Sequence, residues 1–169
     1  MHHIEFQLAT PDDAGTLGSL HAACWRAAYQ GIIPDAYLDG FTPEKRTAFF
    51  ARVLPTTANE NYILKAEREP IGMLAFGPAH DEDLPESVGE IHALYLLPGA
   101  WGKGYGRQAM GFATGRLRAL GYEKASLWVL LDNGRARRFY ARYGFVPDGK
   151  EEPITLGKEL MEARCVMVL

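Results

Sequence analysis

Hydrophobic and polar residues repeat along this chain with two different periods. Short apolar segments occur at residues 4–10, 61–67, 71–76, 89–97, 124–131 and 162–169. Most of them are bounded by Gly, Pro, Asn or Asp, which is typical of β-strands in a half-buried sheet. Four stretches that start near residues 11, 43, 105 and 134 instead place apolar residues three and four positions apart, as amphipathic helices do.

The order of these elements is strand, two helices, three strands, helix, strand, helix and strand. This order predicts an α+β fold, in which helices cover both faces of a mixed, mostly antiparallel sheet. The chain has 169 residues and shows no internal repeat or change in composition, so we expect a single domain over residues 1–169.

Capping and turn residues indicate where several elements begin and end. The segment "TPDD" (10–13) has the spacing of a capping box ahead of the first helix. Asn133 is placed to cap the last helix, and Gly144 is suited to end it. Segments expected to form loops or turns are 31–41, 69–70 and the acidic stretch 77–87.

Charge and composition narrow the classes of function. The net charge is −3, which argues against a nucleic-acid-binding protein with a broad basic surface. Cys24 and Cys165 are far apart and lack metal-ligand spacing, so we expect free thiols and no metal. No apolar run has the length of a transmembrane helix, and the N-terminus lacks the apolar core of a signal peptide. These features predict a cytoplasmic protein that does not act at a membrane.

The densest cluster of glycines lies between a predicted strand and a predicted helix. Gly102, Gly104 and Gly106 directly precede the helical residues. The first N–H groups of a helix lack internal partners and carry partial positive charge, and glycine lets an anion approach closely. Lys103 and Arg107 add positive charge, so this loop is predicted to bind a phosphate group.

Two known phosphate-binding motifs fit this loop poorly. The Walker pattern needs a Ser or Thr after its lysine, whereas Gly104 follows Lys103. Gly104, Gly106 and Ala109 match the dinucleotide pattern G-x-G-x-x-[GA], but the acidic residue expected roughly 20 positions later comes late, at Asp132. The rest of the chain is also too short for the second half of a doubly wound domain. A glycine-rich turn without a ligand is the plain alternative.

The same loop and a later segment resemble two motifs of the GNAT superfamily, the acyl-CoA-dependent N-acyltransferases. The strand "EIHALYLLP" (90–98), followed by Gly104 and Gly106, is similar to the family's strand and its [QR]-x-x-G-x-[GA] loop, except that Trp101 stands in place of Gln or Arg. The segment "NGRARRFYARYGF" (133–145) is similar to the second motif, N-x-x-A-x-x-[FL]-Y-x-x-x-G-F. The resemblance extends over nearly the whole chain.

The resemblance implies a six- to seven-stranded sheet whose strands splay apart around the strand ahead of the loop. It also implies transfer of an acetyl group from acetyl-CoA to an amine of a small molecule or peptide, by a monomer or homodimer and without a metal. Backbone groups of Leu94, Tyr95 and Leu96 would pair with the pantetheine arm as an added strand would. The residues implied to contact the pyrophosphate or pantetheine are Trp101, Gly102, Lys103, Gly104, Tyr105, Gly106, Arg107, Asn133 and Tyr140.

Two residues are candidates for the proton transfers. A lysine-like amine has a pKa near 10.4, so a base would lower the cost of deprotonating it. Glu90 has the strand position of the catalytic glutamate of some family members, and we expect burial to raise its pKa. His92 or a chain of water molecules is the alternative base. Tyr140 matches the family tyrosine that protonates the departing thiolate, or else it is only a packing residue of its helix.

The residues that would bind the acceptor are marked less clearly. The family builds that pocket largely from the first two helices, and the candidates here are Trp25, Tyr29, Ile33 and His92. Aromatic residues near the acidic run 81–83 would suit a cationic amine. Each candidate also has a plain explanation as a core residue or part of a solvated loop. A catalytically silent module that binds or senses acyl-CoA is the alternative to an enzyme.

Overall fold

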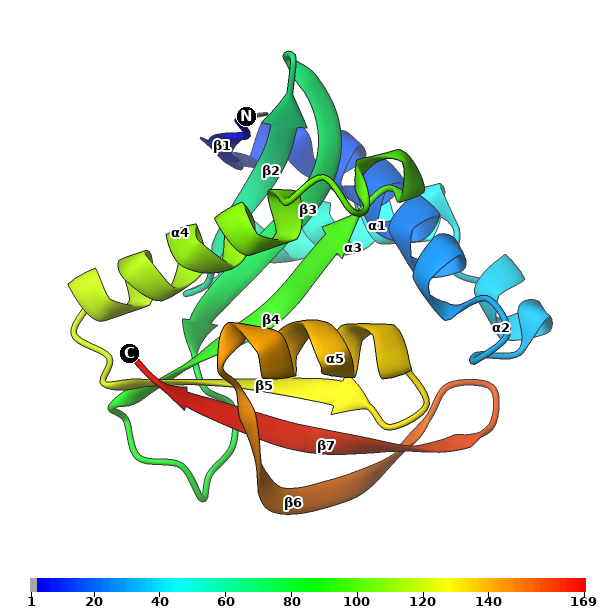
Figure 1. The fold of residues 1–169 in the computed structure, drawn as a ribbon. Coiled ribbons are helices and arrows are strands. Elements are labelled where there is room, and N and C mark those ends of the chain that lie inside the picture. The colour runs from blue at the N-terminus through cyan, green and yellow to red at the C-terminus, as the bar shows by residue number, and fades with distance from the viewer. Residues whose placement is uncertain (1–2) are drawn as a thin grey trace.

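The computed structural model describes residues 3–169 and contains one seven-stranded sheet with the strand order β1-β2-β3-β4-β5-β7-β6 (Figure 1). The strands are β1 (Glu5–Leu8), β2 (Glu60–Ala66), β3 (Glu69–Pro78), β4 (Val88–Leu96), β5 (Lys124–Leu130), β6 (Val146–Thr155) and β7 (Glu159–Val168). The helices are α1 (Ala14–Tyr29), α2 (Asp35–Asp39), α3 (Pro43–Val53), α4 (Tyr105–Ala119) and α5 (Gly134–Tyr143). All neighbouring strands are antiparallel except β4 and β5, which confirms the predicted α+β fold.

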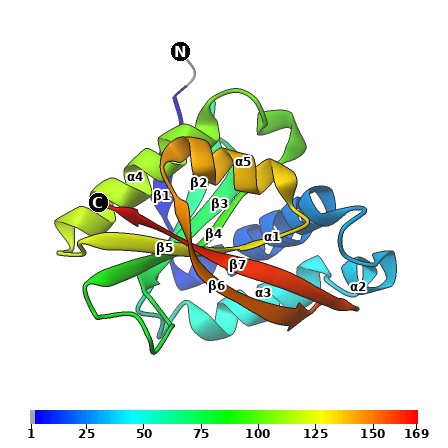
Figure 2. The same cartoon turned by 60° about the horizontal axis from the view of Figure 1, so that its bottom comes forward.

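Helices cover both faces of the sheet (Figures 1 and 2). Consecutive residues of β2 separate two cores, because side chains alternate across a strand. Ile63 faces α1 and α3, where it packs with Leu17 and Phe50. Leu64 belongs to the larger cluster on the opposite face, which includes Met110 of α4 and side chains of α5.

β4 and β5 separate soon after they begin. Their pairing runs only from Val88 opposite Lys124 to Glu90 opposite Ser126. Beyond Glu90, β4 keeps β3 as its partner on one side, while β5 continues to pair with β7. Within the described residues, the far half of β4 therefore has one edge that no strand covers. This is the splay that the family resemblance implies (Figure 1).

The structure adds two elements that the sequence pattern does not predict. β6 lies at the edge of the sheet, is largely exposed and contains Pro147 and Pro153, so it lacks the apolar alternation of a half-buried strand. α2 is a five-residue helix inside the expected loop 31–41. The turn between β2 and β3 falls at Glu67 and Arg68, both with positive φ, rather than at residues 69–70.

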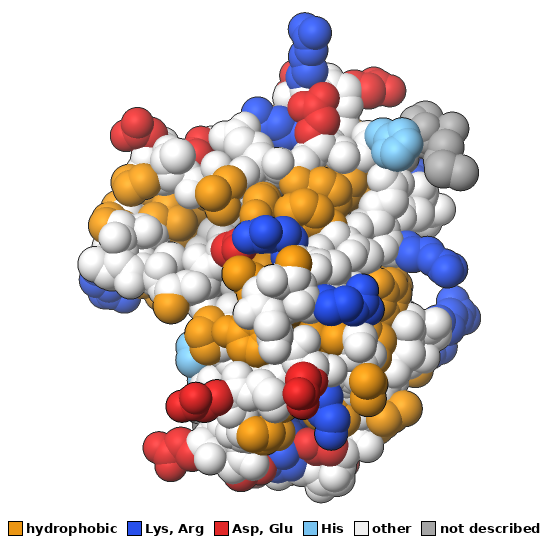
Figure 3. Space-filling view, turned by 90° about the vertical axis from the view of Figure 1, so that its left-hand side faces the viewer, with side chains coloured by type: hydrophobic (Ala, Val, Ile, Leu, Met, Phe, Trp, Pro, Cys, Tyr) orange, Lys and Arg blue, Asp and Glu red, His pale blue; other side chains and the backbone are white. Residues whose placement is uncertain are grey.

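Surface charge, the two cysteines and the helices can be compared with the expectations about nucleic-acid binding, thiols and membranes. On the face that Figure 3 shows, charged side chains of both signs are scattered and form no broad basic surface. Cys24 and Cys165 are both buried and unpaired, as expected. In the part of the chain that the structure describes, no helix combines the length and the apolar character needed to cross a lipid bilayer.

Candidate active site

Two adjoining pockets lie where β4 separates from β5. The first is lined mainly by β4, β5 and the start of α5, and the second by β4, the glycine-rich loop and α5. The residues that line both are Leu94, Leu96, Trp101, Arg135, Ala136 and Tyr140, so the pockets form one continuous cleft. Because β5 has already left β4 at this point, the β4 backbone can pair with an extended ligand.

The second pocket ends at the N-terminus of α4. Gly104 caps this helix with a φ of 82°, and Gly102 has a φ of 73°, a region that favours glycine. A Cβ at either position would meet no atom within 4 Å, so the backbone conformation, and not crowding, requires glycine. The N–H of Gln108 donates to the carbonyl of Gly104, and the amides ahead of it point out of the helix end. This helix end is therefore suited to an anion.

The other loop residues contribute in different ways. Arg107 lines the second pocket, whereas Lys103 is exposed outside it. The side chain of Tyr105 is buried in the core, so its contribution to the loop is its backbone. Gly106 lines the pocket, but a Cβ there would come within 3.2 Å of the Phe139 ring. Gly106 therefore also permits the close packing of α4 against α5.

Three arginines of α5 add positive charge that the sequence analysis does not assign to the site. Arg135, Arg138 and Arg142 all line the second pocket, and their spacing places them along one side of the helix. Arg135 also stacks on Trp101, with its guanidinium carbon 3.4 Å from the ring centroid. The indole N–H of Trp101 donates to the carbonyl of Leu96 at 2.8 Å. The spacing i, i+3, i+7 is the signal in the sequence that identifies this basic side.

Asn133 and Tyr140 come from the start and the middle of α5. The side-chain oxygen of Asn133 accepts a hydrogen bond from the Ala136 N–H at 3.2 Å, which confirms the predicted helix cap. Asn133 also lines the first pocket, and Tyr140 lines both pockets. Burial raises the pKa of Tyr140, so its phenol stays protonated and can donate a hydrogen bond into the cleft.

Glu90 is buried at the point where the two strands separate, with 7% of its surface exposed. Its Oε2 accepts a hydrogen bond from the His80 backbone N–H at 3.0 Å, and its Oε1 lies 3.4 Å from Nδ1 of His92. Burial raises the pKa of Glu90, but the contacts with His92 and His80 outweigh burial and leave the pKa below its ordinary value. The expected upward shift is therefore wrong, because these contacts stabilise the charged carboxylate.

His92 lines the cleft, whereas Glu90 lies behind it. The His92 side chain lines the first pocket, and it contacts the Glu90 carboxylate. Nε2 of His92 donates to the carbonyl of Pro78 at 3.1 Å. Both ring nitrogens of His92 thus have a polar neighbour, the Glu90 carboxylate at Nδ1 and the Pro78 carbonyl at Nε2.

Tyr29 and Trp128 complete the first pocket beside His92. Tyr29, predicted to bind the acceptor, comes from the end of α1, and its hydroxyl lies 3.2 Å from the hydroxyl of Tyr95. Trp128 comes from β5, and its indole N–H donates to Asp81 at 3.0 Å. The sequence marks Trp128 only as an apolar strand residue, so its position in the pocket depends on the splay of the sheet.

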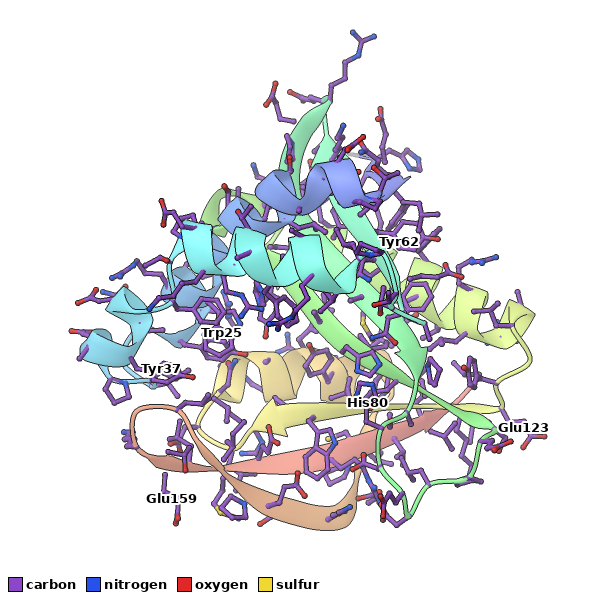
Figure 4. The ribbon with its side chains drawn as sticks, turned by 180° about the vertical axis from the view of Figure 1, so that it is seen from behind. Trp25, Tyr37, Tyr62, His80, Glu123 and Glu159 are labelled. Atoms are coloured by element: carbon purple, nitrogen blue, oxygen red, sulfur yellow. The ribbon has the colours of Figure 1, made fainter. Side chains whose placement is uncertain are left out.

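Two of the predicted acceptor residues occupy packing positions. Trp25 stacks on Phe41, with ring centroids 4.0 Å apart, and Figure 4 shows it among the side chains beside α3. Ile33 is 2% exposed and packs with Leu38 and Leu130. Neither lines the two pockets, because the segment after α1 folds back onto β5 and β7. These two placements do not support direct contact with an acceptor.

The acidic run 81–83 is held by cations of the protein itself. Both carboxylate oxygens of Asp83 accept hydrogen bonds from Arg164, at 2.8 and 2.9 Å, and one also accepts from Lys150 at 2.9 Å. Arg164 and Lys150 hold the pKa of Asp83 well below its usual value. The idea that this run attracts a cationic acceptor is therefore not supported, because β6 and β7 supply the positive charges.

Known proteins share both the sequence pattern and the fold. Residues 22–145 match the acetyltransferase (GNAT) family. A Mycobacterium tuberculosis protein named as a probable N-acetyltransferase is 27% identical over 150 residues, which are 88% of this chain and 83% of that relative. The mycothiol acetyltransferase of Beutenbergia cavernae is 43% identical over 61 residues, but these are 36% of this chain and only 20% of that protein.

A solved structure shows the same fold over the full chain. The paia N-acetyltransferase from Thermoplasma acidophilum, crystallised in complex with coenzyme A, aligns over 99% of both chains with a TM-score of 0.74. Its sequence identity to this chain is 20%. The likeness therefore concerns the arrangement of strands and helices described above.

Proposed function

Because the chain belongs to the GNAT family of acetyltransferases, we propose that it transfers an acetyl group from acetyl-CoA to a primary amine in a ternary complex. The observation that carries this proposal is the continuous cleft, which joins the anion site at α4, the uncovered edge of β4 and Tyr140. The anion site fits the phosphates of one acetyl-CoA molecule, the β4 edge fits its pantetheine arm, and Tyr140 lies where its thioester would be. All parts of the cleft are built on one seven-stranded sheet, which also supports treating residues 1–169 as one domain.

The coenzyme binds along the cleft from the glycine-rich loop towards α5. Its pyrophosphate accepts hydrogen bonds from the first amides of α4 and from Arg107, while Arg138 and Arg142 add positive charge. Its pantetheine amides pair with the backbone of residues 94–96, which β5 leaves uncovered. This path brings the thioester next to Tyr140, which lines both pockets.

The amine nitrogen attacks the carbonyl carbon of the thioester, and the carbon–sulfur bond then breaks to give an amide and coenzyme A. Presenting a lysine-like amine in its neutral form at pH 7 costs roughly 4–5 kcal/mol. Glu90 takes the proton, directly or through one water molecule, since its carboxylate is ionised and adjoins the pocket wall at His92. Tyr140 gives a proton to the departing thiolate and regains one from solvent.

The acceptor enters beside His92, Tyr29 and Trp128. Aromatic faces attract an ammonium group before it is deprotonated. This part of the cleft suits an amine on a small molecule or at the end of a peptide side chain, because it lies at the end farther from the phosphate site.

The test combines coenzyme binding with turnover. Acetyl-CoA raises the melting temperature because it binds only the native state, whereas NADH leaves it unchanged. Release of free coenzyme A is then measured with a panel of primary amines. Stabilisation by acetyl-CoA without release for any amine would support a sensor module, and equal stabilisation by NADH would contradict the coenzyme site itself.

A further inference from the structure

His80, Glu90 and His92 form a cluster that offers three metal-binding atoms, all within 4.8 Å of one another. Glu90 and His92 lie two positions apart and therefore on the same face of β4. His80 is exposed in the loop that follows β3, and Figure 4 shows it beside the sheet. The imidazole rings of His80 and His92 are neighbours, with centroids 4.5 Å apart and ring planes tilted by 33°. Among residues 3–169, no other group of three His, Cys, Asp or Glu side chains converges in this way.

Two of these atoms already have the separation that a zinc ion requires. Nδ1 of His92 and Oε1 of Glu90 lie 3.4 Å apart. Two ligands at about 2.0–2.1 Å from a tetrahedral zinc ion are separated by about 3.4 Å. The third ligand, His80, is exposed and can bring a ring nitrogen to the same point by rotating its side chain.

Hydrogen bonds hold Glu90 and His92 in this orientation. Nε2 of His92 donates to the Pro78 carbonyl, which directs Nδ1 towards the Glu90 carboxylate. Oε2 of Glu90 accepts from the backbone N–H of His80 and leaves Oε1 facing His92. Metal-bound histidines commonly donate their second N–H to a carbonyl or carboxylate in this way.

We propose that His80, Glu90 and His92 bind a divalent transition-metal ion of the zinc class. Two imidazoles and one carboxylate make a ligand set that zinc uses in open sites, with a remaining position for water. The exposed side of His80 gives the ion a path from solvent. Acetyl transfer does not need this ion.

The expected consequence rests on the proposed role of Glu90. A zinc ion on its carboxylate prevents it from accepting the proton of the amine, so zinc acts as a reversible inhibitor. Acetyl-CoA binding is unaffected, because none of the three ligands lines the second pocket, which holds the glycine-rich loop.

The experiment measures zinc binding directly and uses the parent chain with His2→Gln and His3→Gln, since histidines near the N-terminus bind metals themselves. Metal-free protein is titrated with zinc chloride by calorimetry, and cobalt(II) provides an absorption spectrum that reports the coordination geometry. We expect one ion per chain and at least tenfold weaker binding in His80→Gln, which removes a ligand but keeps the backbone N–H at Glu90. Glu86→Gln, an exposed change in the same loop, is the matched control and retains the parent affinity.

The outcomes separate this site from the proposed reaction. Equal zinc affinity in His80→Gln and the parent, or no binding at millimolar zinc, would overturn the metal site. In the coenzyme A release assay, the zinc inhibition constant of His80→Gln rises by the same factor as its dissociation constant. Zinc that binds with the expected ligands while acetyl transfer continues would support the metal site and count against Glu90 as the base.

Discussion

The two ends of the cleft are built from different parts of the polypeptide. At the coenzyme end, ligand-binding groups are mostly backbone amides, exposed by two glycines with positive φ and by the departure of β5 from β4. At the acceptor end, side chains fill the space and contact one another, as Tyr29 does with Tyr95 and Trp128 with Asp81. Backbone recognition demands particular residue types at fixed spacing, whereas a wall of packed side chains can be built in many ways. One end can therefore be identified from sequence, whereas under the proposed function the other end would select the amine.

The largest effect is expected from Glu90→Gln at the acceptor end. The amide keeps the shape of the side chain but cannot take a proton, so turnover at pH 7 falls by about 10²–10⁴-fold. The dissociation constant of acetyl-CoA stays unchanged, because Glu90 does not line the coenzyme pocket. The defect shrinks at high pH, where the amine loses its proton unaided. Glu86→Gln is the control, and unchanged turnover of Glu90→Gln at pH 7 would point to a water chain.

Acidic pH should destabilise the fold through His21, which lies in α1. Burial and the neighbouring Arg46 lower the pKa of His21 to about 3. The unfolded chain, with a histidine pKa near 6.5, binds the proton more readily, so stability falls as the pH drops below that value. The expected loss at about pH 5 is about 2 kcal/mol. Urea unfolding at neutral and acidic pH measures it, and His21→Gln should flatten the dependence; an equal slope in that variant would assign it to other groups.

At the coenzyme end, Gly104→Val tests whether backbone conformation carries the affinity. A φ of 82° costs a valine about 1–2 kcal/mol, so the loop changes shape and acetyl-CoA binding weakens by about tenfold or more. Calorimetric titration with acetyl-CoA measures this change. Gly106→Ala is the matched comparison, since its Cβ meets the Phe139 ring and should lower the melting temperature more than the affinity. Loss of stability without loss of affinity in Gly104→Val would contradict the anion site.

Tyr140 lies where the two ends meet, and Tyr140→Phe removes only its hydroxyl. Ring contacts with Phe139 and Phe145 remain, so the melting temperature should change little. Turnover should fall by about tenfold, because the thiolate then leaves without a proton donor. Single-turnover kinetics separate this step from binding. A fully active but unstable variant would show that Tyr140 is a packing residue alone.

The smallest effect is expected from Tyr29→Ala. The acceptor KM should rise by about three- to fivefold, which corresponds to about 1 kcal/mol of lost contact, while the acetyl-CoA KM stays constant. Tyr29→Phe keeps the ring and loses only the contact with Tyr95, so it controls for packing. The opposite pattern, with a raised acetyl-CoA KM and a normal acceptor KM, would mean that the two ends have been exchanged.

Much of the fold could be predicted because its signals are local. Alternation identifies six strands, and glycines and caps mark the helix ends at Asn133 and Gly144. The sequence pattern does not predict β6, because an exposed edge strand has no buried face that would require alternating apolar residues. The turn before β3 lies at Glu67 and Arg68 and not at the predicted residues 69–70. Both residues adopt positive φ although neither is glycine, so their residue types do not indicate a turn.

The candidate site divides in the same way. Gly102 and Gly104 are visible in the sequence because only their residue type suits the backbone there. The pKa of Glu90 is not visible, since it depends on His80 and His92, which the folding of the β3–β4 connection brings together. The partners of the acidic run 81–83 lie far along the chain and become neighbours only through the order of strands in the sheet.

The ion pairs between Asp83 and Arg164 also have a consequence for biosynthesis. A ribosome makes the connection that carries His80 and leads into Glu90 long before it reaches β7. β7 must then insert between β5, already made, and β6, so that Arg164 can anchor that connection at Asp83. Until β7 is in place, the connection that carries His80 lacks this anchor. The last strand to be made therefore fixes a loop that was made 81 residues earlier.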